Sequence, residues 1–182
     1  MPGAATGSVA TSAVSYPSDQ ITMSAFLARP TMSDPRPAVV IIHEWWGLND
    51  HIKDIAQRFA REGFVALAPD LYVRRRGGTT VTKDAAEAAK LMESLSSQLV
   101  LRDLNATTRH LRTLPFVDPM KIGAVGFCMG GTFALMIAAH NSDIKASVPF
   151  YGQVPPTDSL KYLVAPILYI HGGQDTWITK RE

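Results

Sequence analysis

Apolar residues along the chain occur in short continuous runs separated by amphipathic or polar segments. The run Ala38–Ile42 is β-branched and follows Pro37, which is typical of a strand buried on both faces. The mixed apolar and polar pattern of Ile21–Arg29 instead suits an antiparallel entry strand. Four further strands are predicted by the same criteria: Phe64–Ala68, Lys121–Phe127, Ala146–Tyr151 and Ile167–His171.

Helical periodicity occupies most of the intervening segments. After the candidate N-cap Asn49, and before Gly63, four apolar residues share one helical face: Ile52, Ile55, Ala56 and Phe59. Three more helices are predicted over Lys83–Leu95, Leu99–Leu114 and Gly130–Asn141. Leu71–Thr82 is basic and contains glycine, which indicates a loop.

The alternation of strands and helices predicts an α/β fold with a mostly parallel sheet covered by helices on both faces. A length of 182 residues corresponds to one domain. We expect residues 1–20, rich in Gly, Ala, Ser and Thr, to be a flexible lead-in, and residues 21–182 to form that domain.

Composition and charge exclude several classes of protein. The formal net charge of +2 is too small for a nucleic-acid-binding protein that relies on neutralising phosphates. The single cysteine excludes an internal disulfide and a cysteine-rich zinc site. No apolar run approaches the roughly 18 residues of a membrane span, and the N-terminus lacks the features of a secretory signal. We therefore expect a cytoplasmic monomer without membrane or nucleic-acid partners.

The segment from Gly126 to Gly131, GFCMGG, has the form G-x-C-x-G between a predicted strand and a predicted helix. This is the nucleophile-elbow pattern with cysteine in place of serine. The glycines leave room for a sharp turn, and the backbone N–H of Met129 would face a developing oxyanion. The helix N-terminus would favour the thiolate of Cys128. The alternative is a buried structural cysteine at a tight turn.

Two other segments follow predicted strands, and in parallel sheets such segments meet at one edge. Asp175, in HGGQD, follows the nucleophile in chain order, as does the acid of an α/β-hydrolase triad. A turn-capping Asp is the alternative. His171 lies within the strand end and is interpreted as a structural hydrogen-bonding residue. In HEWWG, the N–H of Trp45 is a second oxyanion donor, and Glu44 either interacts with the Cys128 thiol or is an idle, solvated carboxylate.

The motifs HEWWGLN, APDLY-x-R, GFCMGG and HGGQD, in this order, resemble the dienelactone hydrolase family of the α/β-hydrolase superfamily. The resemblance runs from about Ile21 to the end of the chain. It implies that Cys128 is the nucleophile, that Asp175 is the triad acid and that Glu44 contacts the resting thiol until substrate displaces it.

The same resemblance implies a substrate site. Arg74 matches an arginine that binds the substrate carboxylate, with Arg75 and Arg76 as neighbouring possibilities for the register, and Tyr72 lines the pocket. A solvated basic loop is the alternative for this run. The implied reaction opens an enol-lactone, of the dienelactone-to-maleylacetate type, through an acyl-enzyme. The partner is a small lactone or ester, and no metal or organic cofactor is implied.

One feature departs from the family pattern. The triad histidine should follow Asp175, but the five histidines of the chain all precede it. We therefore expect a C-terminally incomplete α/β-hydrolase fold that lacks the last strand and helix, and low activity of this chain alone. Another carboxylesterase or thioesterase on the same scaffold, or a non-catalytic degenerate hydrolase, are the alternative functions.

Overall fold

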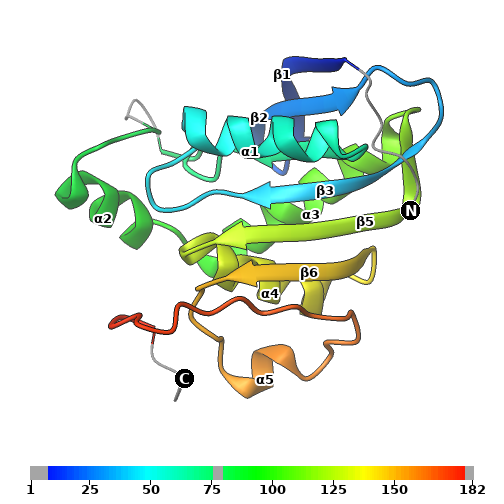
Figure 1. Cartoon of the computed structure of the whole chain (residues 1–182). Helices are drawn as coiled ribbons and strands as arrows, with labels where there is room; N and C mark the ends of the chain where they lie inside the picture. The colour runs from blue at the N-terminus through cyan, green and yellow to red at the C-terminus, as the bar shows by residue number, and fades with distance from the viewer. Residues whose placement is uncertain (1–7, 76–79, 179–182) are drawn as a thin grey trace.

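One sheet forms the centre of the computed structural model, which describes residues 8–75 and 80–178 (Figure 1). In this part of the chain the sheet has six strands in the order β1-β2-β4-β3-β5-β6. Their bounds are β1 (Val9–Ser18), β2 (Ile21–Pro30), β3 (Arg36–Ile42), β4 (Val65–Pro69), β5 (Val117–Phe127) and β6 (Ile144–Phe150). The strands β4, β3, β5 and β6 run parallel, as predicted, and β1 and β2 are antiparallel additions at one edge.

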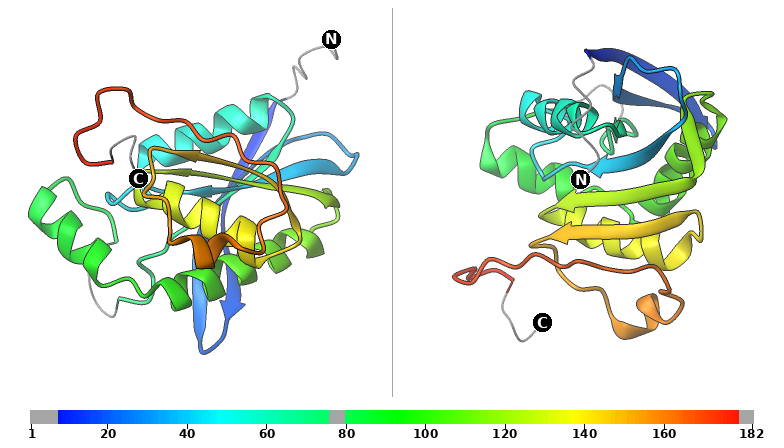
Figure 2. Two further views of the ribbon diagram at one scale, coloured as in Figure 1. Left: turned by 90° about the horizontal axis from the view of Figure 1, so that it is seen from below. Right: turned by 45° about the vertical axis from the view of Figure 1, so that its right-hand side comes forward.

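The helices lie on both faces of this sheet, which confirms the predicted α/β-hydrolase architecture. They are α1 (Asp50–Arg61), α2 (Ala85–Glu93), α3 (Ser97–Thr113), α4 (Met129–His140) and the short α5 (Thr157–Leu160). Figure 2 shows α1 on one face, and α3 and α4 on the other. Helix α2 lies beyond the carboxyl ends of the parallel strands (Figure 1). It therefore stands beside the edge where chemistry is expected.

Helix α1, which follows β3, begins directly after the predicted N-cap residue Asn49. The side chain of Asn49 accepts a hydrogen bond from the N–H of Ile52 at 3.1 Å, which satisfies one of the free donors of the first turn. Ile52 and Ala56 are fully buried against the sheet. Gly63 follows the helix with a φ of 91°, a conformation that favours glycine.

The flexible lead-in expected over residues 1–20 is wrong for most of its length. Val9–Ser18 forms β1, which pairs with β2 along its whole length; residues 1–7 lie outside the described residues. The sequence pattern does not predict this strand, because most of its side chains are exposed or half-buried and are therefore small or polar. The exceptions, Tyr16 and Ser18, are buried against α3.

The predicted strand Ile167–His171 is present only as an extended segment beside β6. Two isolated parallel bridges join it to β6, Ser147 with Ile167 and Phe150 with Ile170. The N–H of Ile170 donates to the carbonyl of Pro149 at 2.9 Å. This irregular edge positions the segment that carries Asp175.

Candidate active site

Cys128 occupies the bend between β5 and α4, with φ 56° and ψ −123°. Such a conformation is strained for a residue other than glycine. The surrounding backbone fixes it, because the N–H of Cys128 donates to the carbonyl of Phe150 at 3.0 Å. A Cβ at Gly126 would lie 1.9 Å from the carbonyl oxygen of Gly130, and one at Gly130 would lie 2.4 Å from that of Ile42. The close approach of three backbone segments therefore requires both glycines.

The surroundings of Cys128 favour the protonated thiol. Burial raises its pKa most, and the negative charges of Glu44 and Asp175 raise it further. The backbone N–H of Met129 acts in the opposite direction by donating to the sulfur. The thiolate-favouring effect expected from the helix N-terminus is therefore outweighed in the unliganded protein.

The loop after β3 carries Glu44 toward Cys128, and the ring of His43 holds this loop in place through hydrogen bonds. The ring of His43 is fully buried and lies between two backbone groups. Its Nε2 accepts from the N–H of Leu71 at 3.1 Å, and its Nδ1 donates to the carbonyl of Glu44 at 2.6 Å. Burial lowers the pKa of His43 to about 4, so the ring is neutral at physiological pH.

Tyr151, which the sequence analysis did not single out, binds the other end of Glu44. Its hydroxyl donates to Glu44 Oε1 at 2.9 Å, and its backbone has a φ of 39°. Burial raises the pKa of Tyr151, and the charge of Glu44 raises it further. Its place directly after β6, at the carboxyl edge of the sheet, was the available signal.

The two predicted oxyanion donors are joined by Tyr72. Its hydroxyl donates to the carbonyl of Trp45 at 2.9 Å and lies 3.6 Å from the sulfur of Met129. The side chain is buried beneath these residues rather than spread along the cavity beside Cys128. Tyr72 therefore contacts both the loop of Trp45 and the first residue of α4, Met129, whose N–H groups are candidates for the oxyanion hole.

Asp175 lies in the turn after the irregular edge segment. Its Oδ1 accepts from the N–H groups of Trp177 at 2.8 Å and Ile178 at 3.0 Å, and these bonds lower its pKa. Asp175 therefore caps a turn, as one of the two interpretations of the sequence proposed. It also lines a cavity together with Cys128. One role does not exclude the other, because only one carboxylate oxygen is bound in the turn.

A cavity of about 660 Å³ brings Cys128, Met129, Tyr151 and Asp175 together. The remaining lining residues, from α2 onward along the chain, are Met92, Leu95, Ser97, Thr132, Phe133, Gln153, Trp177 and Ile178. Most of this lining is apolar, so the cavity is suited to a small organic substrate.

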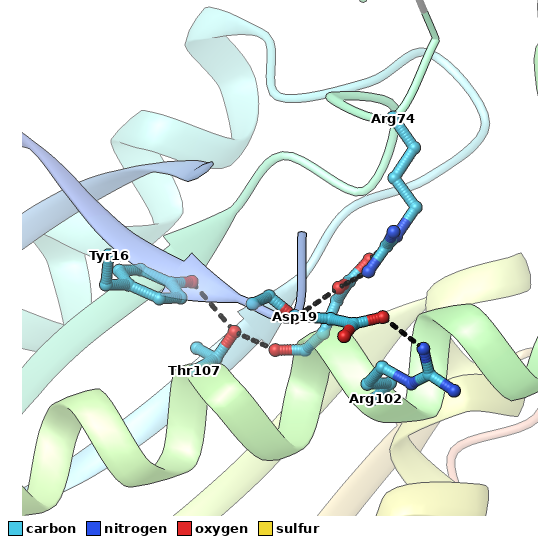
Figure 3. Close-up of polar contacts among 7 residues, drawn as sticks. Tyr16, Asp19, Arg74, Arg102 and Thr107 are labelled. Carbon is cyan, nitrogen blue, oxygen red and sulfur yellow. Dashed lines mark hydrogen bonds and ion pairs between the residues drawn. The ribbon is translucent and has the colours of Figure 1, made fainter. Parts of the chain in front are cut away.

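Arg74 does not line this cavity. Its guanidinium forms two hydrogen bonds with Asp103 of α3, Nε to Oδ2 at 2.7 Å and Nη2 to Oδ1 at 2.6 Å (Figure 3). Arg75 forms a single charged hydrogen bond, from Nη1 to Glu87 Oε1 at 2.7 Å. Arg76 lies outside the described residues. The structure therefore separates the predicted carboxylate-binding arginine from the predicted nucleophile.

His171 is half-buried and stacks on Tyr169, with ring centroids 6.4 Å apart. Within residues 8–75 and 80–178, no three His, Cys, Asp or Glu side chains are grouped as metal ligands would be. Over the same ranges, none of the helices combines the length and apolarity that crossing a membrane requires.

The sequence of this chain is similar to the sequences of proteins from several organisms. A Synechocystis sp. protein provisionally named a carboxymethylenebutenolidase is 36% identical over 92% of this chain and 69% of its own length. A Methylorubrum extorquens protein with the same provisional name is 31% identical over 91% of this chain. The chain spans only 60% of the Methylorubrum protein.

Solved structures superpose closely. A Klebsiella pneumoniae protein, provisionally named a dienelactone hydrolase, has a TM-score of 0.87 at 31% identity over 96% of this chain and 77% of its own. A dienelactone hydrolase-like promiscuous phosphotriesterase from metagenomic libraries has a TM-score of 0.84 at 29% identity over 96% of this chain and 73% of its own. The model of the dienelactone hydrolase family matches residues 23–182. This chain therefore belongs to the dienelactone hydrolase family.

Proposed function

We propose that this protein opens enol-lactones, and cleaves related esters, by covalent catalysis at Cys128. The observation that carries the proposal is the strained bend that presents Cys128 to a cavity also lined by Asp175. A Bradyrhizobium relative, 36% identical over 86% of this chain, is provisionally named a 2-oxo-3-(5-oxofuran-2-ylidene)propanoate lactonase, which supports the same reaction class.

The first step needs a thiolate, although the resting group is a thiol. Glu44 is the candidate proton acceptor, since its charge acts on Cys128 and its Oε1 is oriented by Tyr151. The thiolate sulfur attacks the lactone carbonyl carbon, and the carbonyl electron pair moves to oxygen. The N–H groups of Trp45 and Met129 then stabilise that oxyanion; one such donor contributes about 2.7–4 kcal/mol in comparable sites.

Collapse of the oxyanion breaks the ring C–O bond and leaves a thioester on Cys128. The departing enolate takes the proton from Glu44 and becomes the ketone. Water must then cleave the thioester, a step that needs a base, which by family resemblance is a histidine oriented by Asp175. No histidine follows Asp175 in these 182 residues, so we expect this polypeptide to acylate readily and to release the acyl group slowly.

Intact-protein mass spectrometry after mixing with an enol-lactone or a p-nitrophenyl ester tests the acylation. One acyl group per chain is expected, with one equivalent of p-nitrophenolate released from the ester. The sole cysteine makes the assignment simple. Cys128→Ala should remain unlabelled. Equal labelling of that variant, or no adduct on the native chain, would contradict the proposal and favour a non-catalytic protein.

Glu44→Gln tests the role of the carboxylate. Removing its negative charge lowers the pKa of Cys128, so iodoacetamide should alkylate the thiol about threefold faster or more at pH 8. Acylation by the lactone should become slower, because the proton acceptor is gone. Glu62→Gln, at the end of α1, is the control. If both rates stay at the native value, Glu44 is the idle loop carboxylate instead.

A further inference from the structure

We propose that His43 and Tyr72 are positioning residues for the oxyanion hole, because they hold the two peptide groups that flank the Cα atom of Trp45. The inference rests on the proposed function, in which the Trp45 N–H stabilises the oxyanion formed at the substrate carbonyl. His43 is fully buried and Tyr72 is 1% exposed, so both side chains act through the backbone rather than by touching substrate.

The carbonyl of Glu44 and the N–H of Trp45 belong to one planar peptide group. No peptide bond among the described residues is cis, so this C=O and this N–H point in opposite directions. The Nδ1–H of His43 donates to the carbonyl at 2.6 Å. A hydrogen bond at one end of a rigid group sets the direction of the other end. The buried ring therefore directs the Trp45 N–H away from itself.

The His43 ring is itself fixed in orientation. Its Nε2 accepts from the N–H of Leu71 at 3.1 Å, so only the neutral tautomer with its proton on Nδ1 satisfies both contacts. The ring also packs against that of Tyr72, with centroids 5.1 Å apart. Turning the imidazole away from the Glu44 carbonyl would leave buried polar groups without partners, which is unfavourable.

Two further carbonyls of this loop accept hydrogen bonds from segments that follow β4. The carbonyl of Trp45 accepts from the Tyr72 hydroxyl at 2.9 Å, which fixes the peptide group on the other side of the Trp45 Cα atom. The carbonyl of Trp46 accepts from the N–H of Thr82 at 3.2 Å. With the peptide groups held on both sides, the Trp45 N–H needs no reorientation when charge develops on a substrate oxygen.

The test compares two reactions of Cys128 that differ in their need for an oxyanion donor. Acylation by p-nitrophenyl acetate passes through a tetrahedral oxyanion, whereas alkylation by iodoacetamide displaces iodide and forms none. Both reactions need the thiolate, so the ratio of their rate constants cancels changes in the pKa of Cys128. We expect His43→Gln, whose amide replaces Nε2 rather than Nδ1, to lower the acylation-to-alkylation ratio about tenfold or more.

Three variants accompany His43→Gln. His43→Asn restores an amide N–H near the position of Nδ1 and should keep the ratio within about threefold of the native value. Tyr72→Phe, which removes only the hydroxyl bound to Trp45, should lower the ratio about threefold or more, and it answers the question if His43→Gln does not fold. His110→Gln is the matched control, because His110 also packs on a tyrosine, Tyr16, and its ratio should equal the native one.

The carbonyl stretch of the acetyl thioester is a readout that a general loss of stability would not move. Infrared difference spectra of chains acylated with ¹²C- and ¹³C-carbonyl acetate isolate this band. An oriented N–H polarises the thioester carbonyl and lowers its frequency. We therefore expect the band to shift to higher frequency in His43→Gln and Tyr72→Phe, and to stay at the native frequency in His110→Gln.

The outcomes separate this inference from the proposed function. If acylation and alkylation change by the same factor in His43→Gln and in Tyr72→Phe, or if the carbonyl band keeps its native frequency in both, the positioning roles are wrong and covalent catalysis stands. If the ester does not acylate Cys128 in the native chain, the proposed function fails, and the positioning roles fail with it.

Discussion

Two polar regions of this protein, around Asp103 and around Cys128, differ in how completely their polar groups are paired. Around Asp103, a cluster formed by Tyr16, Ser18, Arg74, Asp103 and Thr107 joins β1, the loop after β4 and α3 (Figure 3). Every polar side chain of this Asp103 cluster has a partner. At Cys128 the backbone is strained, and burial, together with the charges of Glu44 and Asp175, raises the pKa of the thiol.

The difference follows from what each region has to do. In the Asp103 cluster, Thr107 shares a hydrogen bond with the hydroxyl of Tyr16 at 2.8 Å and donates to the carbonyl of Asp103 at 2.8 Å, so that burial leaves no polar group unsatisfied. The proposed reaction at Cys128 needs a sulfur that keeps unused bonding capacity until substrate arrives. If that proposal holds, stability and reactivity are assigned to different parts of the carboxyl edge of the sheet and its flank.

The largest effect on stability is expected in the Asp103 cluster, where every polar side chain has a hydrogen-bond partner. Asp103→Ala leaves the Arg74 guanidinium and the Ser18 hydroxyl without their partner, and should lower the free energy of unfolding by about 3 kcal/mol. Denaturant titration measures this loss. Asp19→Ala, which breaks the exposed ion pair with Arg102, should cost less than about 0.5 kcal/mol. Equal losses in the two variants would remove the basis of the comparison.

His43 is a fully buried polar group with partners at both ring nitrogens, one of them the carbonyl of Glu44. The unfolded chain binds a proton near pH 6.5, whereas the folded protein binds one only near pH 4. Stability from this residue is therefore present above pH 6.5 and decreases as the pH falls toward 4, by about 2 kcal/mol at pH 4.5.

This loss is measured as the difference in unfolding free energy between pH 7 and pH 4.5. His43→Gln should show a smaller difference, since the titrating ring is gone, and His51→Gln, an exposed residue of α1, should behave like the native chain. An identical pH dependence in His43→Gln would mean that the buried ring does not titrate as its surroundings indicate.

The smallest effect concerns backbone strain at Cys128, the proposed nucleophile. Cys128→Gly and Cys128→Ala both remove the sulfur, but only glycine adopts a φ of 56° at no cost. We expect the glycine variant to be the more stable by about 1 kcal/mol, although alanine is normally favoured through the unfolded state. Thermal unfolding of the two variants provides the comparison, and a more stable alanine variant would argue against stored strain.

Much of the site could be predicted because local sequence rules and the shape of the backbone agree there. The spacing of Gly126 and Gly130 around Cys128 predicts a turn in which a Cβ would collide with neighbouring backbone, and the structure shows those close approaches. Chain order placed Asp175 at the same edge of the sheet, and both residues line one cavity.

Other features depended on residues distant in sequence. Tyr151 meets Glu44 across 107 positions, and Arg74 meets Asp103 across 29. A sequence motif shows which residue types are present, but it does not show with which of several possible partners each side chain interacts in the folded protein. For Arg74, the buried Asp103 is the partner, and Arg74 is not among the residues that line the cavity at Cys128.

By itself, the sequence determined the parallel α/β arrangement, the cysteine bend and the order of the strand-end loops, because each depends on periodicity, caps and glycines that act over a few residues. Only the tertiary structure decided that residues 9–18 form an edge strand and that Arg74 and Arg75, in the loop after β4, form ion pairs with Asp103 and Glu87. The physical reason is that strand pairing and burial of charge depend on which distant groups meet. Those groups are brought together by packing of the whole sheet against its helices.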